Sequence, residues 1–215
     1  IAGSDSITGL SVLSVPSASV PVGIRTTIKE AVFGSSGKNI ITGAPVIAIG
    51  SPTGTLGSVV FGNITGADDS LELPDNDLCR LSTDMYGSND ATGFLINLDG
   101  AVVGMIDMQY RDNNIPNMLC AVGISELRPI IRRMESGTTK SFLGIRGIDV
   151  TNAISEANNI PVGVWVTRVE DDSPAMAAGI QKGDVITGFG NDDILHMAGL
   201  IVKLEMTESG QNVTL

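Results

Sequence analysis

The sequence predicts a mainly β protein of 215 residues, built from short strands joined by tight turns. Two general observations support this class: the chain contains 26 glycines, and its apolar runs are short and end at turn-forming residues. The third observation is a hairpin pattern at 93–98 and 101–109, two apolar runs that flank Asp99-Gly100. Asp-Gly in this position is a strong hairpin signal, because both central residues of the tight turn need a positive φ.

The composition narrows the possible classes of function. Apolar residues make up 42% of the chain and charged residues 17%, so a packed core is expected and global disorder is not. The net charge of −11 disfavours binding to nucleic acid or to anionic membrane surfaces, which both require clustered Lys and Arg. No apolar run approaches the ~20 residues that cross a bilayer. Because the chain starts at Ile1, within an apparent strand, we expect it to be a fragment of a longer protein.

The first two thirds of the sequence consist of short strands and one helix. The expected strands are 10–15, 44–49, 56–65, 78–83, 93–98, 101–109 and 119–124, with a Ser/Pro/Gly/Thr-rich loop at 16–39. Ser125 is expected to cap a helix that ends at Gly137. Its apolar side chains share one face at helical spacing: Leu127, Ile130, Ile131 and Met134.

A polar segment at 137–140 is the expected linker between domains 1–136 and 141–215. The second domain is predicted to alternate strands, at 142–145, 162–169 and 185–189, with helices at 173–179 and 198–206. Pro174 at the first helical position and Gly179 at the end favour the first of these helices. Residues 212–215 are expected to begin a further strand that is cut short.

Residues 82–100 resemble the nucleophile loop of the HtrA/DegP serine proteases, whose pattern runs T-D…G-N-S-G-G-x-L-x-N-L-x-G. Aligned on Leu95-Ile96-Asn97-Leu98-Asp99-Gly100, the nucleophilic serine falls on Ala91. Residues 5–12 are similar to the family pattern D-x-x-T-D-L-A-V, and the triad aspartate falls on Gly9. Residues 46–54 resemble V-x-A-I-G-N-P-x-G, an early strand and turn of the family's second barrel.

The second half of the chain resembles the PDZ domain that follows the protease in this family. Ser141-Phe142-Leu143-Gly144-Ile145 is similar to the Y-L-G-I carboxylate-binding loop, and 173–186 to S-P-A…A-G-L…G-D-V-I. The resemblance implies a trypsin-like (chymotrypsin-type) β-barrel followed by an α+β PDZ domain that is truncated at its C-terminus. It also implies a bacterial, extracytoplasmic location, either membrane-anchored or secreted.

The resemblance implies serine endopeptidase chemistry, but the positions that would perform it are degenerate. A triad needs a nucleophile, a base and an orienting carboxylate, and two of these positions hold Ala91 and Gly9. Asn89, followed by Asp90, stands where the family has its oxyanion-hole glycine. The leading hypothesis is therefore a pseudoprotease. An active protease would need Ser88 or Thr92 as a displaced nucleophile, and Asp5 could replace Gly9 only if its loop shifted. Local hydrogen bonding is the simpler expectation for the two hydroxyls, and loop capping for Asp84 and Asp90 near the site.

PDZ domains bind extended peptides as an added strand and capture the terminal carboxylate with backbone amides. The resemblance assigns this loop to Phe142, Leu143, Gly144 and Ile145, and the facing helix wall to Ile201 and Leu204. The alternative for the apolar members is plain core packing. His196, the only histidine in the chain, is expected to be a surface or helix-capping residue.

Cys79 and Cys120 lie on strands that are neighbours in the family's second barrel, so a disulfide and two free thiols are equally open. No metal or cofactor is expected. The expected partners are unfolded or C-terminally exposed polypeptides, an active HtrA relative, or further copies in a homo-oligomer such as a trimer, with no nucleic acid. Three functions follow: a peptide-binding pseudoprotease of protein quality control, an active serine endopeptidase with an unrecognised nucleophile, and a structural subunit of an HtrA assembly.

Overall fold

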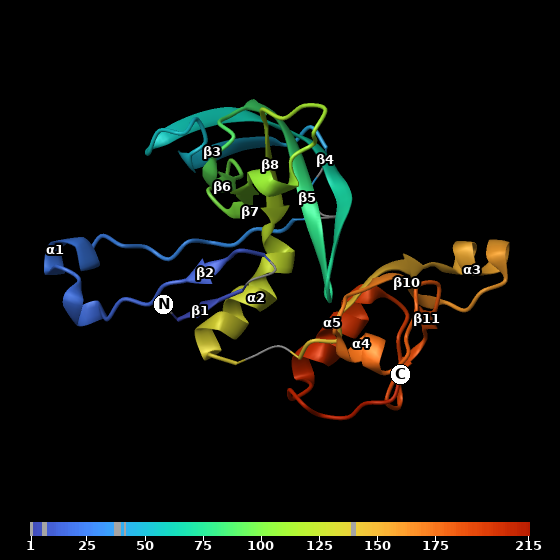
Figure 1. Ribbon diagram of the computed structural model, residues 1–215. Helices are drawn as coiled ribbons and strands as arrows, with labels where there is room; N and C mark the ends of the chain where they lie inside the picture. Colours follow the sequence, from blue (N-terminus) through green and yellow to red (C-terminus); the bar gives the residue numbers. More distant parts are fainter. Residues whose placement is uncertain (1, 6–7, 37–39, 41, 139–140) are drawn as a thin grey trace. The chain divides into compact units, whose positions relative to one another are not determined.

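The computed structural model describes residues 2–5, 8–36, 40, 42–138 and 141–215, and Figure 1 shows its helices and strands. The residues cluster into two compact units, each described here by itself. The first consists chiefly of Gly9–Ser70 and Leu78–Glu135, and the second chiefly of Leu71–Asp77 and Ser136–Leu215. The domains expected from the sequence differ from this clustering at 71–77, and residues 139–140 of the expected linker lie outside the described residues.

A closed antiparallel β-barrel forms the centre of the first unit, in the order β3-β4-β5-β8-β7-β6. This barrel and the sheets of the second unit confirm the predicted mainly β class. The barrel strands are β3 (Pro45–Ser51), β4 (Ser58–Leu73), β5 (Asn76–Tyr86), β6 (Thr92–Ile96), β7 (Val102–Asp107) and β8 (Met118–Gly123).

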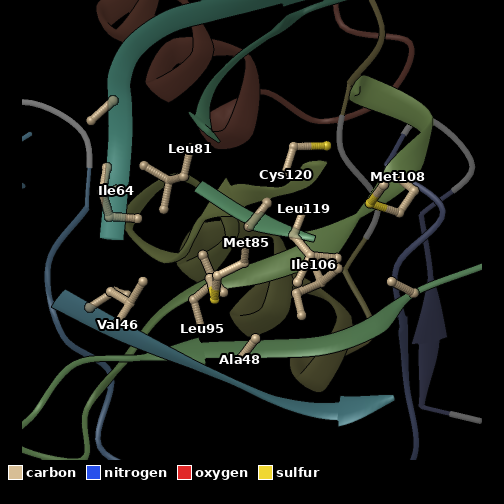
Figure 2. Packing of buried hydrophobic residues seen from close by; sticks show 14 residues of the cluster. Val46, Ala48, Ile64, Leu81, Met85, Leu95, Ile106, Met108, Leu119 and Cys120 are labelled. Atoms are coloured by element: carbon tan, nitrogen blue, oxygen red, sulfur yellow. The ribbon is translucent and has the colours of Figure 1, made fainter. Parts of the chain in front are cut away.

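The barrel closes around a core of aliphatic and sulfur-containing side chains, seen in Figure 2. Alternate residues of β5 point inward, so Leu81 and Met85 are buried while Asp84 between them is exposed. They meet Leu95 of β6 and Leu119 of β8 in one cluster. Because burial of each such aliphatic side chain contributes about 1.5–3 kcal/mol, the alternation fixes which face of β5 lies inside.

The remaining elements of the first unit are short, apart from one helix. They are β1 (Gly3–Ser4), β2 (Ser11–Val12), η1 (Ser17–Ser19), α1 (Val22–Arg25), η3 (Met108–Tyr110) and α2 (Ile124–Ser136). The apolar face predicted for α2 is confirmed for Leu127, Ile130 and Met134, which are buried. Ser125 is not the N-cap, because α2 already includes Ile124; its Oγ instead accepts a hydrogen bond from the Ser36 N–H at 2.9 Å.

The β6–β7 hairpin is confirmed, but its turn differs from the prediction. The connection spans residues 97–101, and only Gly100 of the Asp99-Gly100 pair has a positive φ, +80°. Asn97 Oδ1 accepts hydrogen bonds from the Asp99 and Ala101 N–H groups at 3.1 and 2.9 Å. The asparagine side chain therefore holds a longer loop that a two-residue turn cannot describe.

The second unit contains a three-stranded antiparallel sheet in the order β11-β10-β9, so β9 is an edge strand. Ile145, Val164, Val166 and Leu200 belong to one buried core between this sheet and the helices. Its elements are β9 (Ile145–Val150), α3 (Asn152–Asn158), β10 (Gly163–Val169), α4 (Pro174–Ala177), β11 (Val185–Ile186), β12 (Gly188–Phe189), β13 (Asp192–Asp193) and α5 (Met197–Met206).

The sequence located β10, α4 and α5 but missed β9 and α3. As expected, Pro174 is the first residue of α4, and the Oγ of the N-cap Ser173 accepts a hydrogen bond from Met176 N–H at 3.1 Å. The expected strand at 212–215 is not formed, although the Gly190 N–H donates to the Thr214 carbonyl at 2.8 Å. One isolated bond of this kind does not make a ladder.

Candidate functional site

The loop that resembles a nucleophile loop is closed by hydrogen bonds within itself. Ala91, which the motif predicts at the position of the nucleophilic serine, is 3% exposed and stands directly before β6. The Ala91 N–H donates to the Ser88 carbonyl at 3.1 Å, and the Asp90 N–H donates to Ser88 Oγ at 3.2 Å. An oxyanion hole needs backbone amides aimed at the reacting oxygen, and the Ala91 amide is aimed at the loop instead.

Two carboxylates considered in the sequence analysis, Asp5 and Asp84, make structural contacts. Asp5 accepts a hydrogen bond from Arg133 of α2 at 2.6 Å, in an ion pair with both side chains mostly buried. Asp84 accepts from the side-chain and backbone N–H groups of Asn63 at 2.8 and 2.6 Å, and these two bonds lower its pKa. Gly9 is exposed with φ +68° and carries no carboxylate.

The alternative nucleophiles Ser88 and Thr92 lie in this loop, and the one histidine of the chain lies on another element. Ser88 Oγ already accepts the Asp90 N–H, and Thr92 lies exposed at the start of β6. His196 is the N-cap of α5, and its Nδ1 accepts a hydrogen bond from Gly199 N–H at 2.9 Å. The expectation that His196 is a capping residue is thus confirmed.

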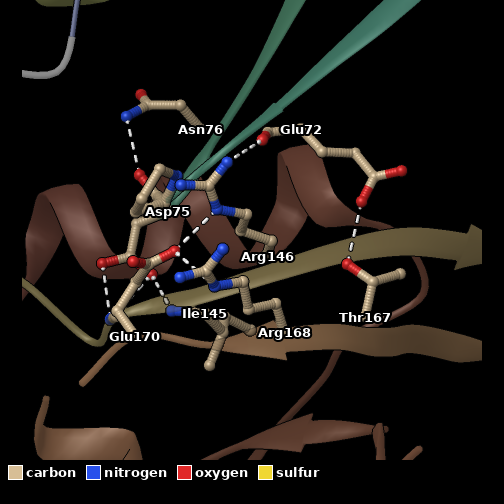
Figure 3. A network of polar contacts seen from close by, with 10 residues as sticks. Glu72, Asp75, Asn76, Ile145, Arg146, Thr167, Arg168 and Glu170 are labelled. Atoms are coloured by element: carbon tan, nitrogen blue, oxygen red, sulfur yellow. Dashed lines mark hydrogen bonds and ion pairs between the residues drawn. The ribbon is translucent and has the colours of Figure 1, made fainter. Parts of the chain in front are cut away.

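The loop at 141–145 is organised around Gly144 and gathers three backbone N–H groups on one carboxylate. Gly144 has φ +85°, and a Cβ added to it would lie 2.3 Å from Ser173 Cβ, so only glycine fits. The Leu143 N–H donates to Asp75 Oδ2 at 2.7 Å, and the Ile145 N–H donates to Asp75 Oδ1 at 3.1 Å. The Gly144 N–H lies 3.0 and 2.9 Å from the two oxygens. Figure 3 shows Asp75 against Ile145, at the start of β9.

A hollow of about 480 Å³ lies beside this loop. Phe142 and Leu143 line it together with Leu204 of α5, so the structure brings these three predicted residues together. Ile145 is fully buried in the core, and Ile201 is half-buried and packs against that core. As peptide-binding residues all of them stay predictions.

Of the two alternatives held open for Cys79 and Cys120, the structure has no disulfide between them. The register of β5 and β8 places Cys120 opposite Ser82, so the two cysteines are not directly opposed. Cys79 Sγ donates to the Ala67 carbonyl at 2.8 Å, and Cys120 Sγ donates to the Asp107 carbonyl at 2.9 Å. Burial, reinforced by the nearby Asp107, raises the pKa of the Cys120 thiol to about 11.

Sequence reasoning missed Asp75. The segment Leu73-Pro74-Asp75-Asn76 has the composition of a turn, and the structure places Pro74 and Asp75 at the turn between β4 and β5. That turn signal could have been found, because it lies between two strand-forming runs. What the turn contacts is a long-range property, since Asp75 and Gly144 are 69 positions apart in sequence.

Comparisons with known proteins agree with this architecture. The family model of the PDZ domain matches residues 141–215. The chain is 29% identical over 93% of its length to "Serine protease Do-like HtrB" of Bacillus subtilis. It is 31% identical over 99% of its length to a "periplasmic serine endoprotease DegP-like" protein of Rickettsia prowazekii. The chain spans 46% and 42% of these two relatives, so it corresponds to less than half of each.

Solved structures support the same fold. The HtrA-type protease AlgW with a bound decapeptide superposes with a TM-score of 0.54 at 22% identity, covering 84% of this chain and 57% of that protein. The same protease with a tripeptide gives the same TM-score, with 85% of this chain covered. A closed six-stranded barrel that precedes a PDZ domain confirms the trypsin-like fold predicted from the motifs. The chain is therefore an HtrA-like protein in which a trypsin-type β-barrel is followed by a PDZ domain.

Proposed function

We propose that this chain is a non-catalytic, peptide-binding HtrA-like protein of extracytoplasmic protein quality control, which holds C-termini at the loop 141–145. The observation that carries the proposal is the convergence of the Leu143, Gly144 and Ile145 N–H groups on a single carboxylate, that of Asp75. A peptide C-terminus ends in the same chemical group. Three backbone donors fixed in one loop form the kind of nest that captures it.

The barrel supports the non-catalytic part of the proposal. Ala91 has no nucleophilic atom, Gly9 has no carboxylate, and the Ala91 N–H is bonded to the Ser88 carbonyl. Removing triad residues from a serine protease leaves only about 10³–10⁴-fold rate enhancement over water, which comes from the oxyanion hole and from binding. With its amide turned into the loop, this chain would lose that remainder as well.

Relatives named as periplasmic endoproteases support the extracytoplasmic assignment. Within the described residues, the helices are too short and too polar to cross a membrane. The partners proposed are unfolded or C-terminally exposed polypeptides. Two further partners are proposed: an active HtrA relative, and other copies of this chain in an oligomer such as a trimer.

The test is binding of a defined peptide pool to the 215-residue chain, followed by fluorescence anisotropy. The pool contains labelled decapeptides with a free C-terminal Ala, Val, Leu, Ile or Phe, and a second pool carries the same sequences with an amidated C-terminus. Charge-assisted hydrogen bonds contribute about 1.5–3 kcal/mol, so the amidated pool should bind about tenfold more weakly or worse. The lengths of the peptides should be unchanged after incubation.

Two results would contradict the proposal. Equal binding of both pools would remove the C-terminal carboxylate as the recognised group. Cleavage of the decapeptides would instead favour the active endopeptidase, with Ser88 or Thr92 as the residues to examine first.

A further inference from the structure

The turn between β4 and β5 occupies the carboxylate-binding loop of the same unit. This hairpin tip, residues 71–77, clusters with 136–215. Asp75 is 1% exposed, and its two carboxylate oxygens receive the N–H groups of residues 143–145. All three donors that a peptide carboxylate would use are therefore engaged by a side chain of the chain itself.

The backbone of Asp75 completes the likeness to a bound peptide. Its own N–H donates to the Ile145 carbonyl at 2.8 Å, while the Ile145 N–H donates to its carboxylate. A peptide added to the edge strand β9 would make this pair of contacts with its last residue: one main-chain bond to the strand and a carboxylate on the loop amides. Asp75 thus presents both recognition elements of a C-terminal residue.

Glu72 fastens the hairpin tip at two further points. Its Oε2 accepts a hydrogen bond from Thr167 Oγ1 at 2.8 Å, and its carbonyl accepts from Arg146 at 3.1 Å. Arg146 is held in turn by Glu170, with 2.6 Å between Nε and Oε1. Figure 3 shows these contacts around the start of β9. Glu72 contacts side chains of β9 and β10 and makes none of the hydrogen bonds by which the loop amides hold Asp75.

The backbone at Asp75 is in a strained conformation. Its φ of +52° lies in the left-handed region, which few non-glycine residues occupy and which aspartate tolerates better than most. The surrounding contacts must therefore hold a conformation that the turn alone does not favour. Loss of those contacts would let the Asp75 backbone return to a more favourable conformation, and this favours release of the hairpin tip from the loop.

We propose that the hairpin tip is an internal competitor for the carboxylate-binding loop, so that a C-terminal peptide binds only after it displaces Asp75. The proposal rests on the proposed peptide-binding function and adds its regulation. Asp75 belongs to the same chain as the loop, so its carboxylate is present at the loop at a high effective concentration. The apparent affinity for peptide then equals the affinity of the open loop multiplied by the fraction of molecules in which the tip is released.

The experiment measures the affinity of the free-acid decapeptide pool for the native chain and for three variants. Asp75→Ala removes the competing carboxylate. If the tip is released in about 1–10% of molecules, this variant should bind about 10–100-fold more tightly. Glu72→Ala loosens the tip without touching the loop amides and should tighten binding about threefold, a smaller population shift of the same kind.

Asp172→Ala is the matched control. Asp172 is an exposed aspartate with φ +55°, so its replacement changes charge and backbone strain as Asp75→Ala does. The carboxylate that the N–H groups of residues 143–145 hold belongs to Asp75 and not to Asp172. The Asp172→Ala variant should therefore bind the peptides with the affinity of the native chain. Thermal unfolding and the amide NMR spectrum of each variant show whether it is folded.

The outcomes separate this proposal from the proposed function. Equal affinity of the native chain and a folded Asp75→Ala variant would overturn the competitor but leave peptide binding intact. Absence of binding to every variant would overturn both. If Asp75→Ala does not fold, the Glu72→Ala result decides, and unchanged affinity there would overturn the competitor. In the native chain, added peptide should also shift the amide signals of Glu72 and Asp75, and no shift at saturation would count against displacement.

Discussion

The loops at 88–92 and 141–145 both offer backbone N–H groups, and they use them in opposite ways. In the first, the Asp90 and Ala91 N–H groups donate back to Ser88, so the loop satisfies itself. In the second, the three N–H groups from Leu143 to Ile145 point to one carboxylate contributed by another segment. An anion site requires donors that their own turn does not consume. The comparison teaches that the second loop holds a carboxylate with its backbone donors, whereas the first loop uses its donors internally.

The largest effect we expect comes from Gly93→Ala. It tests whether β6, which directly follows the first loop, packs so closely against β3 that no side chain fits. Gly93 has φ +132°, and an added Cβ would lie 1.9 Å from the Ile49 carbonyl on β3, so the paired strands would have to separate. The loss of unfolding free energy should exceed about 3 kcal/mol. Urea unfolding followed by circular dichroism measures it.

Gly100→Ala is the control within the same hairpin. Gly100 has φ +80° with open space around the added Cβ, so its replacement should cost only about 1 kcal/mol. Equal losses of unfolding free energy in the two variants would show that only backbone strain is at work. They would contradict a steric clash between β6 and β3.

The next largest effect concerns Gly144 and tests the second loop directly. Gly144→Ala should weaken binding of free-acid decapeptides by about tenfold or more, because the clash with Ser173 displaces the N–H groups that hold a carboxylate. Gly179→Ala is a close match in backbone conformation, with φ +84° against +85°, but its Cβ meets nothing within 4 Å. That variant should lose about 1 kcal/mol of stability and no affinity. Full affinity in a folded Gly144→Ala variant would exclude the loop as the carboxylate site.

Asp84 gives the smallest expected effect and tests whether the carboxylate near the first loop has a structural role. Hydrogen bonds from Asn63 lower its pKa below the ordinary 3.8, so its stabilisation is complete above that value. It is lost as the pH falls through the lower, folded-state pKa. Asp84→Asn should therefore flatten the dependence of stability on pH below about pH 4, by a small amount because the side chain is exposed.

Urea midpoints at several values between about pH 2 and 5 measure this dependence. Asp90→Asn, which removes one charge from the first loop and leaves the Asn63 contacts of Asp84 intact, is the control for loss of a carboxylate. A large stability loss in Asp84→Asn at neutral pH would show that the carboxylate does more than hold Asn63.

Much of the fold followed from local patterns. The β6–β7 hairpin, α4 with Pro174 at its first position and the apolar face of α2 are set by residues close in sequence, and the sequence located all three. The strands β4 and β5 run further than expected, to Leu73 and from Asn76, because their acidic ends resemble loop sequence. Cross-strand register also lay beyond local pattern, and it decides that Cys120 faces Ser82.

The candidate site was predicted in part, because only some of its residues lie in stretches with a local sequence pattern. Motif spacing placed Ala91, Gly144 and the helix carrying Leu204, because each lies in a stretch whose order in the sequence is informative. Asp75 belongs to no such stretch, and its role depends on contacts with residues about 70 positions away. Turn composition can predict that Asp75 lies at a hairpin tip but not what the tip touches.

The most direct test of the non-catalytic proposal is to incubate the native chain with a fluorophosphonate probe and with unfolded casein, beside an active HtrA control. An Ala91→Ser variant belongs in the same experiment, because the restored hydroxyl still lacks a carboxylate at Gly9 and a free oxyanion amide. We predict no labelling and no casein cleavage by either chain, with both activities present in the control. Labelling of the native chain at Ser88 or Thr92, together with casein cleavage, would contradict the proposal and show that the active site works with a different nucleophile.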